Sequence, residues 1–391
     1  YASEYLRSEW TALDKETAAD LAFLDDQLEG DFEILAVTND MTKAVIYSDA
    51  ADAPGVYYVY DRAADTLSEM FATRPDLDGA PLQPMQSIEI ESRDGLSLVS
   101  YLTLPPGADA DGDGRPEEPG PMVLAVHGGP WARDSYGYTS WHQWMSNRGY
   151  AVLSVNYRGS TGFGKGFTNA AVKEFAGKMH DDLIDAVNWA VTEGVADADK
   201  VAIAGGSYGG YATLTGVAFT PDTFACGVDI VGPSSLVTLV ESFPDYWGPF
   251  LEGTWYKYVG NPANEEDRAD MLARSAISRV DDISVPLLIG QGENDPRVTK
   301  LESDQLVAAM AERELPVTYV NFPDEGHGFA RPENRLAFYA VMESFLAECL
   351  GGRAEPINDA FEGSSIQVLH GADFVGGLAD AVTAHDSASE E

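Results

Sequence analysis

The middle of the chain alternates between short apolar runs and longer stretches in which apolar residues recur every three or four positions. Apolar runs of four to eight residues, bounded by glycine or polar residues, indicate buried strands. In one longer stretch Leu183, Val187 and Ala190 share a helical face. This alternation predicts a mostly parallel sheet with helices on both faces. The expected strands are residues 121–126, 150–156, 201–204, 224–231, 285–290 and 317–322, and the expected helices are residues 181–193, 211–219, 302–312 and 334–350.

Residues 1–84 carry a different pattern, in which short runs with strand composition are separated by turn residues. Four antiparallel strands in about 45 residues have the size of one β-propeller blade. A lone blade cannot bury both of its faces, because such units become stable only when they are stacked on neighbours. We therefore predict a partial propeller blade in residues 1–84, ending in a proline-rich linker at residues 74–84. The four expected strands are residues 32–38, 43–49, 56–61 and 66–71.

Residues 85–355 are predicted to form one α/β domain, which begins with a hairpin that turns at Arg93-Asp94-Gly95. The segment 233–283 interrupts the alternation and is rich in aromatic residues, so we expect it to form a wall over the C-terminal edge of the sheet. Residues 356–391 lose periodicity and are predicted to be a C-terminal tail. We expect disorder over residues 385–391.

The composition is unusual in its charge. Lys and Arg number 24 against 64 Asp and Glu, which gives a formal net charge of −40 and predicts an acidic, solvated surface. No basic run could neutralise phosphates, so we expect no nucleic-acid partner. No apolar run reaches about 18 residues, so we expect a soluble protein with no membrane partner. The chain begins at Tyr1 rather than at Met, which leaves the cytoplasm, the periplasm and secretion open as compartments.

The two cysteines, Cys226 and Cys349, are too few for a disulfide framework. Cys226 lies in an apolar run with strand character. We therefore expect it to be a small buried hydrophobic residue.

The expected strand at residues 201–204 leads into Gly205-Gly206-Ser207-Tyr208-Gly209, and a stretch able to form a helix follows. This is the G-x-S-x-G pattern in the setting of a nucleophile elbow, a sharp turn that holds a serine between a strand and a helix. Glycines on either side allow strained backbone angles. The helix directs N–H groups toward developing negative charge. Ser207 is therefore the candidate nucleophile.

A serine nucleophile needs a base that takes its proton and an acid that orients the base. Among the histidines after Ser207, His327 directly follows an expected strand, and flanking glycines leave room for its ring. Asp295 lies deep in the loop after the strand at 285–290, with Glu293 as its rival. The order serine, acid, histidine is that of α/β-hydrolases. We predict the triad Ser207, Asp295 and His327.

The oxyanion hole of such a site uses two backbone N–H groups. The first belongs to the residue after the nucleophile, Tyr208. The second is expected in the loop after the strand at 121–126, which reads His127-Gly128-Gly129-Pro130. Gly129 is the candidate, and His127 is expected to shape the turn.

Five motifs in this order resemble the catalytic half of the prolyl oligopeptidase family, in its acylaminoacyl-peptidase and dipeptidyl-peptidase branch. The resemblance implies an α/β-hydrolase fold over residues 85–355. It also implies a serine peptidase that cleaves short peptides through an acyl-enzyme on Ser207 without a cofactor. Arg297 resembles a family arginine near the substrate. The motifs, within about residues 86–350, are His127-Gly128-Gly129-Pro130, Asn156-Tyr157-Arg158-Gly159-Ser160, Gly205-Gly206-Ser207-Tyr208-Gly209-Gly210-Tyr211, Asn294-Asp295-Pro296-Arg297-Val298 and Glu325-Gly326-His327-Gly328-Phe329.

In this family a propeller restricts access to the site, but only about one blade precedes the α/β domain here. A carboxylesterase acting on short acyl esters with the same triad is therefore the alternative, and a non-catalytic binding fragment is a second one. Besides a peptide or ester substrate, the expected partners are a missing propeller segment or a second copy of the chain. The aromatic residues of 233–258, with Tyr246 and Trp247 among them, are expected to line an apolar substrate pocket or to pack the wall.

Asp109, Asp111 and Asp113 occupy alternate positions in the first half of a calcium-loop pattern. The twelfth position of the pattern is Gly120, where a bidentate glutamate is required. A structural Ca²⁺ and an acidic surface loop are both open interpretations of this segment.

Overall fold

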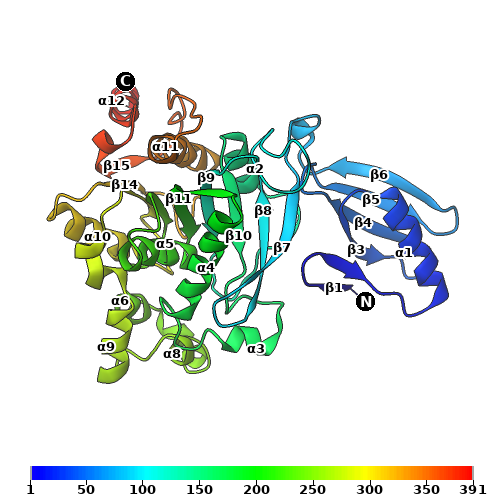
Figure 1. The fold of residues 1–391 in the computed structure, drawn as a ribbon, viewed down its shortest axis with the longest axis horizontal. Helices are drawn as coiled ribbons and strands as arrows, with labels where there is room; N and C mark the ends of the chain where they lie inside the picture. The colour runs from blue at the N-terminus through cyan, green and yellow to red at the C-terminus, as the bar shows by residue number, and fades with distance from the viewer. Residues whose placement is uncertain (1, 390–391) are drawn as a thin grey trace.

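The computed structural model describes residues 2–389, which form a nine-stranded sheet with helices on both faces and, beside it, a four-stranded sheet (Figure 1). From β14 to β10 the strands of the large sheet run parallel, and the strands at both edges run antiparallel. This confirms the predicted α/β-hydrolase fold. Across the sheet the strands are β15 (Gln367–His370), β14 (Val317–Phe322), β13 (Leu287–Gly292), β12 (Cys226–Ile230), β11 (Ala196–Gly206), β9 (Gly120–Val126), β10 (Ala151–Val155), β8 (Ser97–Thr103) and β7 (Met85–Glu91).

The two faces of this sheet pack into two apolar cores. In β9, Leu124 and Val126 belong to one core, whereas Val123 and Ala125 belong to the other. Because both faces are covered, the parallel strands are apolar at nearly every position. These continuous apolar runs are what allowed the strands to be predicted from the sequence. Helices α4 (Lys178–Thr192), α5 (Tyr208–Phe219) and α10 (Leu301–Ala311) contribute to the first core, and α2 (Ser140–Asn147) and α11 (Pro332–Leu350) contribute to the second.

The segment that interrupts the alternation is mostly helical. It contains α6 (Leu236–Glu241), α7 (Gly248–Leu251), α8 (Trp255–Tyr258) and α9 (Glu265–Ala273). Leu236 and Leu239 of α6 are buried in the first core, and Phe243 and Trp255 pack against it. The expectation of an aromatic wall is therefore met by short helices rather than by an extended loop.

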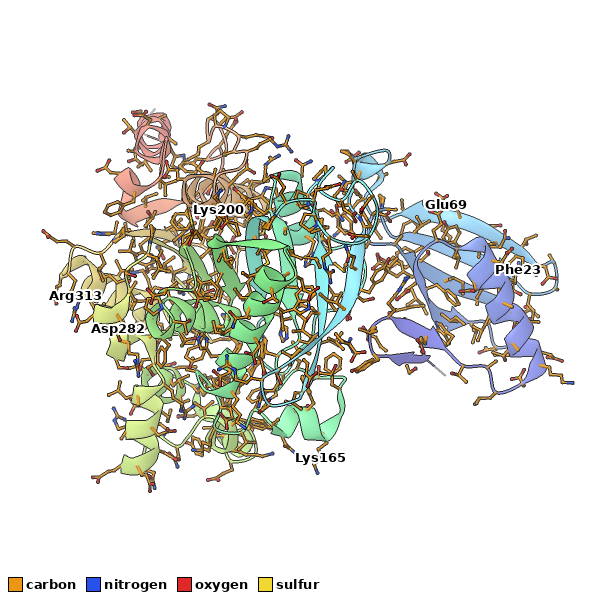
Figure 2. All side chains as sticks on the ribbon, in the orientation of Figure 1. Phe23, Glu69, Lys165, Lys200, Asp282 and Arg313 are labelled. Carbon is orange, nitrogen blue, oxygen red and sulfur yellow. A yellow bond between two sulfur atoms is a disulfide. The ribbon has the colours of Figure 1, made fainter. Side chains whose placement is uncertain are left out.

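The smaller sheet confirms the expected propeller-like unit. Its strands β3 (Asp31–Val37), β4 (Lys43–Asp49), β5 (Val56–Asp61) and β6 (Thr66–Ala72) pair antiparallel in sequence order. Helix α1 (Lys15–Gln27) covers one face of this sheet, where Leu24 packs with Ile46 and Tyr60. Phe23 of α1 is labelled in Figure 2, and its ring stacks on that of Tyr60 with 5.3 Å between the ring centroids. The helix thus buries the apolar residues on this face of the sheet.

The opposite face of the blade is a half-exposed aromatic surface. The rings of Tyr47 and Tyr57 lie 4.9 Å apart, and the same distance separates Tyr57 from Phe71. Phe71 is 53% exposed. Among the described residues, none of the apolar core clusters includes these three rings.

A short hairpin that the sequence did not indicate joins the blade to the large domain. It consists of β1 (Ala2–Glu4) and β2 (Ser8–Trp10). Arg133 donates to the carbonyl oxygens of Glu4 and Tyr5, and the Tyr101 hydroxyl donates to Leu6 O at 2.9 Å. Because Arg133 follows the loop of Gly129, the hairpin supports the segment next to the predicted oxyanion hole.

The C-terminal residues are folded onto the large domain, which corrects the expectation of a separate tail. Strand β15 pairs with β14, and α12 (Leu378–Ser389) packs into the second core through residues such as Leu378. The expectation of disorder is wrong for residues 385–389, which lie in α12, whereas residues 390–391 lie outside the described residues. Among residues 2–389 no helix combines the length and the apolar character that crossing a membrane requires.

Cys226 and Cys349 form a disulfide between the start of β12 and the end of α11. The expected burial of Cys226 is correct, but the residue is disulfide-bonded and is not simply a small hydrophobic residue. The two residues are 123 positions apart, and only the return of α11 across the sheet brings them together. Sequence spacing carries no signal for such a pair.

We expect reduction of this disulfide to lower the free energy of unfolding by ~2–5 kcal/mol, because the unfolded chain regains the entropy of a long loop. The measurement is the melting temperature with and without a thiol reductant. The double variant Cys226→Ala/Cys349→Ala is the control, and its melting temperature should not respond to reductant. Two reactive thiols in the unfolded, unreduced protein would contradict the pairing.

Candidate active site

Ser207 lies on a sharp turn between β11 and α5. Its backbone has φ +58° and ψ −117°, a conformation that non-glycine residues rarely adopt. A Cβ atom on Gly209 would lie 2.1 Å from Val126 O, and one on Gly205 would lie 2.6 Å from the same oxygen. Both positions therefore require glycine, and the turn brings Ser207 to the C-terminal edge of the sheet.

Two backbone contacts hold this turn in place. The Ser207 N–H donates to Ile230 O at 2.8 Å, which ties the turn to β12. The Tyr211 N–H donates to Ser207 O at 3.0 Å, which begins α5. The first N–H groups of α5 have no partner within the helix and lie beside the nucleophile.

Asp295 and His327 meet in space as the sequence predicts. His327 Nδ1 lies 2.7 Å from Asp295 Oδ2, and the carboxylate is completely buried. The N–H groups of Arg297 and Val298 donate to Asp295 Oδ1 at 2.8 and 3.0 Å. The carboxylate is thus fixed from two sides, and it can hold Nδ1–H so that Nε2 is free to accept a proton.

His327 and Ser207 line the same cavity. Among residues 2–389 no hydrogen bond joins Ser207 Oγ to His327 Nε2. Such bonds are often formed only when substrate is bound.

The other carboxylates near these loops are engaged elsewhere. Asn321 donates to Glu293 Oε2 at 2.8 Å. Asp324 pairs with Arg331, and Glu325 accepts the backbone N–H of Ala330 at 2.9 Å. Of the carboxylates on these two loops, Asp295 is therefore the one that the described chain brings to His327.

The loop after β9 passes directly beside the nucleophile. A Cβ on Gly128 would lie 3.4 Å from Ser207 Cβ, and Gly129 lines the cavity with φ +123°. His127 Nε2 lies 2.9 Å from Ser160 Oγ, and the His127 ring stacks on Tyr157. His127 thus shapes the loop from behind, while Gly129 faces the same space as Tyr208.

The cavity beside Ser207 has a volume of about 380 Å³ and mostly apolar walls. Arg297 and Trp247 line it, but Tyr246 is 73% exposed and does not. Phe243 and Trp255, two aromatic residues of the segment 233–258, also line it. The sequence-based prediction missed Leu236 and Leu239, although their helical spacing could have indicated one face. The lining residues are Gly129, Phe175, Ser207, Tyr208, Tyr211, Pro233, Leu236, Leu239, Phe243, Trp247, Trp255, Arg297, Val298 and His327.

A larger hollow of about 900 Å³ lies between α2, α11 and residues 355–362. It contains none of the predicted site residues, so size alone does not locate the chemistry.

Burial keeps the tyrosines of the cavity neutral. It raises the pKa of the Tyr208 hydroxyl well above its usual range, and it also raises the pKa of Tyr211. The Tyr211 hydroxyl donates to Arg274 O at 2.7 Å. Within the described chain, the residues that line the cavity include no carboxylate, and Arg297 is their one permanent charge.

The predicted calcium ligands lie close together on the surface. One carboxylate oxygen from each of Asp109, Asp111 and Asp113 falls within 4.8 Å of the others. Their oxygens already accept backbone N–H groups, for example those of Gly112 and Gly114 at Asp109. The loop is thus held together by its own hydrogen bonds, and it lacks the bidentate glutamate of the full pattern.

Comparisons with known proteins agree with this geometry. The pattern of the prolyl oligopeptidase family matches residues 137–353. The chain is 61% identical over 383 residues to dipeptidyl aminopeptidase BIII of Pseudoxanthomonas mexicana, and this covers 98% of the chain and 55% of that protein. It is 42% identical over 350 residues to dipeptidyl peptidase family member 6 of Caenorhabditis elegans, which covers 86% of the chain and 47% of that protein. The chain thus spans about half the length of these relatives.

Among solved structures, a puromycin-hydrolyzing peptidase of Mycobacterium tuberculosis is similar with a TM-score of 0.70 and 27% identity. The match covers 80% of this chain and 47% of that one. The two proteins therefore share this architecture. As with the curated relatives, this chain matches about half of the longer protein.

The close contact at Gly209 predicts that a side chain at this position disturbs Ser207. Gly209→Ala should slow the labelling of Ser207 by a fluorophosphonate at least ~100-fold, because the new Cβ must push the nucleophile out of place. The matched control is Gly206→Ala, where the nearest atom to a Cβ would lie 3.8 Å away. Labelling rates and melting temperatures of both variants are measured together. Equal labelling of the two variants would show that the steric contact does not govern the site.

Proposed function

The chain belongs to the prolyl oligopeptidase family, and from this premise we propose that it is the catalytic part of a serine peptidase that cleaves short peptides. The observation that carries the proposal is the buried Asp295–His327 pair, whose ring lines one cavity with the Ser207 elbow. Fold alone would not support an activity, because the same architecture hosts many functions.

The proposed reaction is acyl transfer to water. Ser207 Oγ attacks the substrate carbonyl while its proton moves to His327 Nε2. Asp295 holds Nδ1–H and stabilises the imidazolium that forms. His327 then gives the proton to the leaving amine, which departs and leaves an ester on Ser207. A water molecule repeats the sequence, with its proton taken by His327, and releases the acid product.

The negative charge of the tetrahedral intermediate is assigned to two backbone donors, the N–H groups of Tyr208 and Gly129. What supports this is that both residues line the cavity beside Ser207. Tyr208 also opens α5, whose N-terminal end favours negative charge. Each such donor is typically worth ~3 kcal/mol of the barrier.

The walls of the cavity favour a substrate with an apolar side chain next to the scissile carbonyl. Phe175, Leu236 and Leu239 are among the lining residues. Burying one such side chain contributes ~1.5–3 kcal/mol of binding. Arg297 adds one cation, which suits a peptide carbonyl, and Trp247 is kept as a candidate contact. Tyr246 is not proposed as a pocket residue, because its side chain is exposed and does not line the cavity.

Recognition of a free N-terminus is proposed to come from outside this chain. One relative is named a dipeptidyl aminopeptidase and another a dipeptidyl peptidase family member. A free amine is typically held by carboxylates. In the described residues no carboxylate lines the cavity. The chain therefore supplies the chemistry and an apolar pocket, and the selection of the substrate's N-terminus belongs to another segment.

The half-exposed face of Tyr47, Tyr57 and Phe71 supports a missing propeller segment as the partner, since a blade is stable only between neighbours. A second copy of the chain is the other proposed partner. For the compartment we favour the periplasm or secretion over the cytoplasm, because disulfides persist in oxidising surroundings.

A structural Ca²⁺ at Asp109, Asp111 and Asp113 is the remaining proposal, and the close approach of the three carboxylates supports it. It would stabilise the loop and take no part in the reaction. The triad chemistry needs no cofactor.

If the proposal is correct, a fluorophosphonate should label the folded protein and should not label Ser207→Ala. Asp295→Asn should remain folded and lose ~10⁴-fold in kcat, because the histidine is then held in the wrong tautomer. Mass spectrometry of the adduct and steady-state rates with an apolar aminoacyl anilide are the measurements. A wild-type protein that is folded and unlabelled would refute the proposed enzyme.

The alternative is a carboxylesterase with the same triad, and the open, apolar cavity is what favours it. A peptidase should cleave aminoacyl or dipeptidyl anilides with a kcat/KM well above that of Ser207→Ala, as well as short-chain nitrophenyl esters. Ester cleavage with no measurable anilide cleavage would favour the esterase.

A further inference from the structure

Val231 has an unusual backbone conformation one residue beyond Ile230, whose carbonyl oxygen at the end of β12 accepts the Ser207 N–H. Its φ is +49°, in the left-handed region. A β-branched residue is a genuine outlier there, since its Cβ substituents crowd the backbone. Val231 is 3% exposed, so solvent does not relax it. Strained conformations of this kind persist only where the surroundings enforce them, and they cluster at functional sites.

The side chain of Asp229 closes the turn that contains Val231. Asp229 Oδ1 accepts the N–H of Gly232 at 2.8 Å. The Val231 N–H donates to Gly290 O at 2.8 Å, so the turn stays attached to β13 while it changes direction. These two hydrogen bonds fix residues 229–232 from both sides.

Two glycines make room for this carboxyl group. A Cβ on Gly232 would lie 2.2 Å from Asp229 Oδ1, and so would a Cβ on Gly210. Gly210 belongs to the first turn of α5, directly after the elbow. Asp229 therefore packs between the turn and the helix that begins at the nucleophile, and it is fully buried.

Asp229 has no cation beside it among the described residues, and burial raises its pKa well above the usual range. Burial thus favours the neutral form of this carboxyl group. In either form its Oδ1 is the acceptor of the Gly232 N–H.

The turn touches two parts of the site. Ile230 O accepts the Ser207 N–H at 2.8 Å, and Pro233 lines the cavity. A change in the direction of residues 229–232 would therefore move both the support of the nucleophile and one wall of the pocket.

We propose that Asp229 is a positioning residue: by holding Gly232 it keeps Val231 left-handed, and the resulting turn sets the places of Ser207 and of the Pro233 wall. This rests on the proposed function, in which Ser207 is the nucleophile. Asp229 itself does not touch the substrate.

The test uses four variants of the full chain: Asp229→Ala, Asp229→Asn, Val231→Gly and the double variant Asp229→Ala/Val231→Gly. Asp229→Ala removes the acceptor and should lower kcat by ~10- to 100-fold, as expected for a small displacement of the reacting groups. Asp229→Asn keeps an acceptor oxygen at Oδ1, so its kcat should fall much less than that of Asp229→Ala. Glycine adopts the left-handed conformation without a side-chain clash. The double variant should therefore regain at least ~10-fold in kcat over Asp229→Ala, an effect of the size of a partly restored position.

Leu346→Ala is the control for simple loss of stability, because Leu346 lies in α11 and is buried in the second core. It should lower the melting temperature and leave kcat of the folded protein unchanged. Rates are taken at a temperature where every variant is folded, together with fluorophosphonate labelling.

A higher kcat in the double variant than in Asp229→Ala would support the positioning role. If Asp229→Ala only weakened packing, removing the Val231 side chain as well would lower kcat or stability further and would not restore kcat. A folded Asp229→Ala with wild-type kcat would overturn it, and so would a loss of kcat that glycine does not restore. If Asp229→Ala does not fold, a folded and active double variant supports the role, and an unfolded one overturns it. Absence of labelling in the wild type would instead refute the proposed function, and this inference with it.

Discussion

The close contact between the elbow and β9 constrains the rest of the site. Gly205 and Gly209 both approach Val126 O so closely that no side chain fits between them. The strand that carries Ser207 and the strand that leads to Gly129 therefore form one rigid unit. Donors that are already in place when negative charge develops need no reorganisation, and this is the main source of their effect on rate.

The proposed acid and base follow two further strands of the same sheet, β13 and β14. Asp295 follows β13 and His327 follows β14, so the parallel register of these strands sets how their loops meet. The pocket walls come instead from α6 and the helices after it. The proposed triad residues thus lie at or just after strand ends, whereas residues of an inserted helical segment line the cavity beside them.

Much of the fold and of the site could be predicted because continuous apolar runs mark the parallel strands, and Ser207, Asp295 and His327 each follow one of them closely. The rest depends on contacts between distant residues. The Cys226–Cys349 pairing and the attachment of β15 arise only when the chain returns across the sheet. Tyr246 could not be separated from Trp247, because short irregular helices have no periodicity that shows which side chain points inward.

The disulfide divides the proposed active site into two parts of the chain. Asp295, His327 and the helical wall lie between Cys226 and Cys349, inside a covalently closed ring, whereas Ser207 and the Gly129 loop lie outside it. A protease that cuts an exposed loop within the ring would leave both fragments linked. The acid and base half would then stay attached to the nucleophile half, and the nicked protein would run as one species until a reductant separated the pieces.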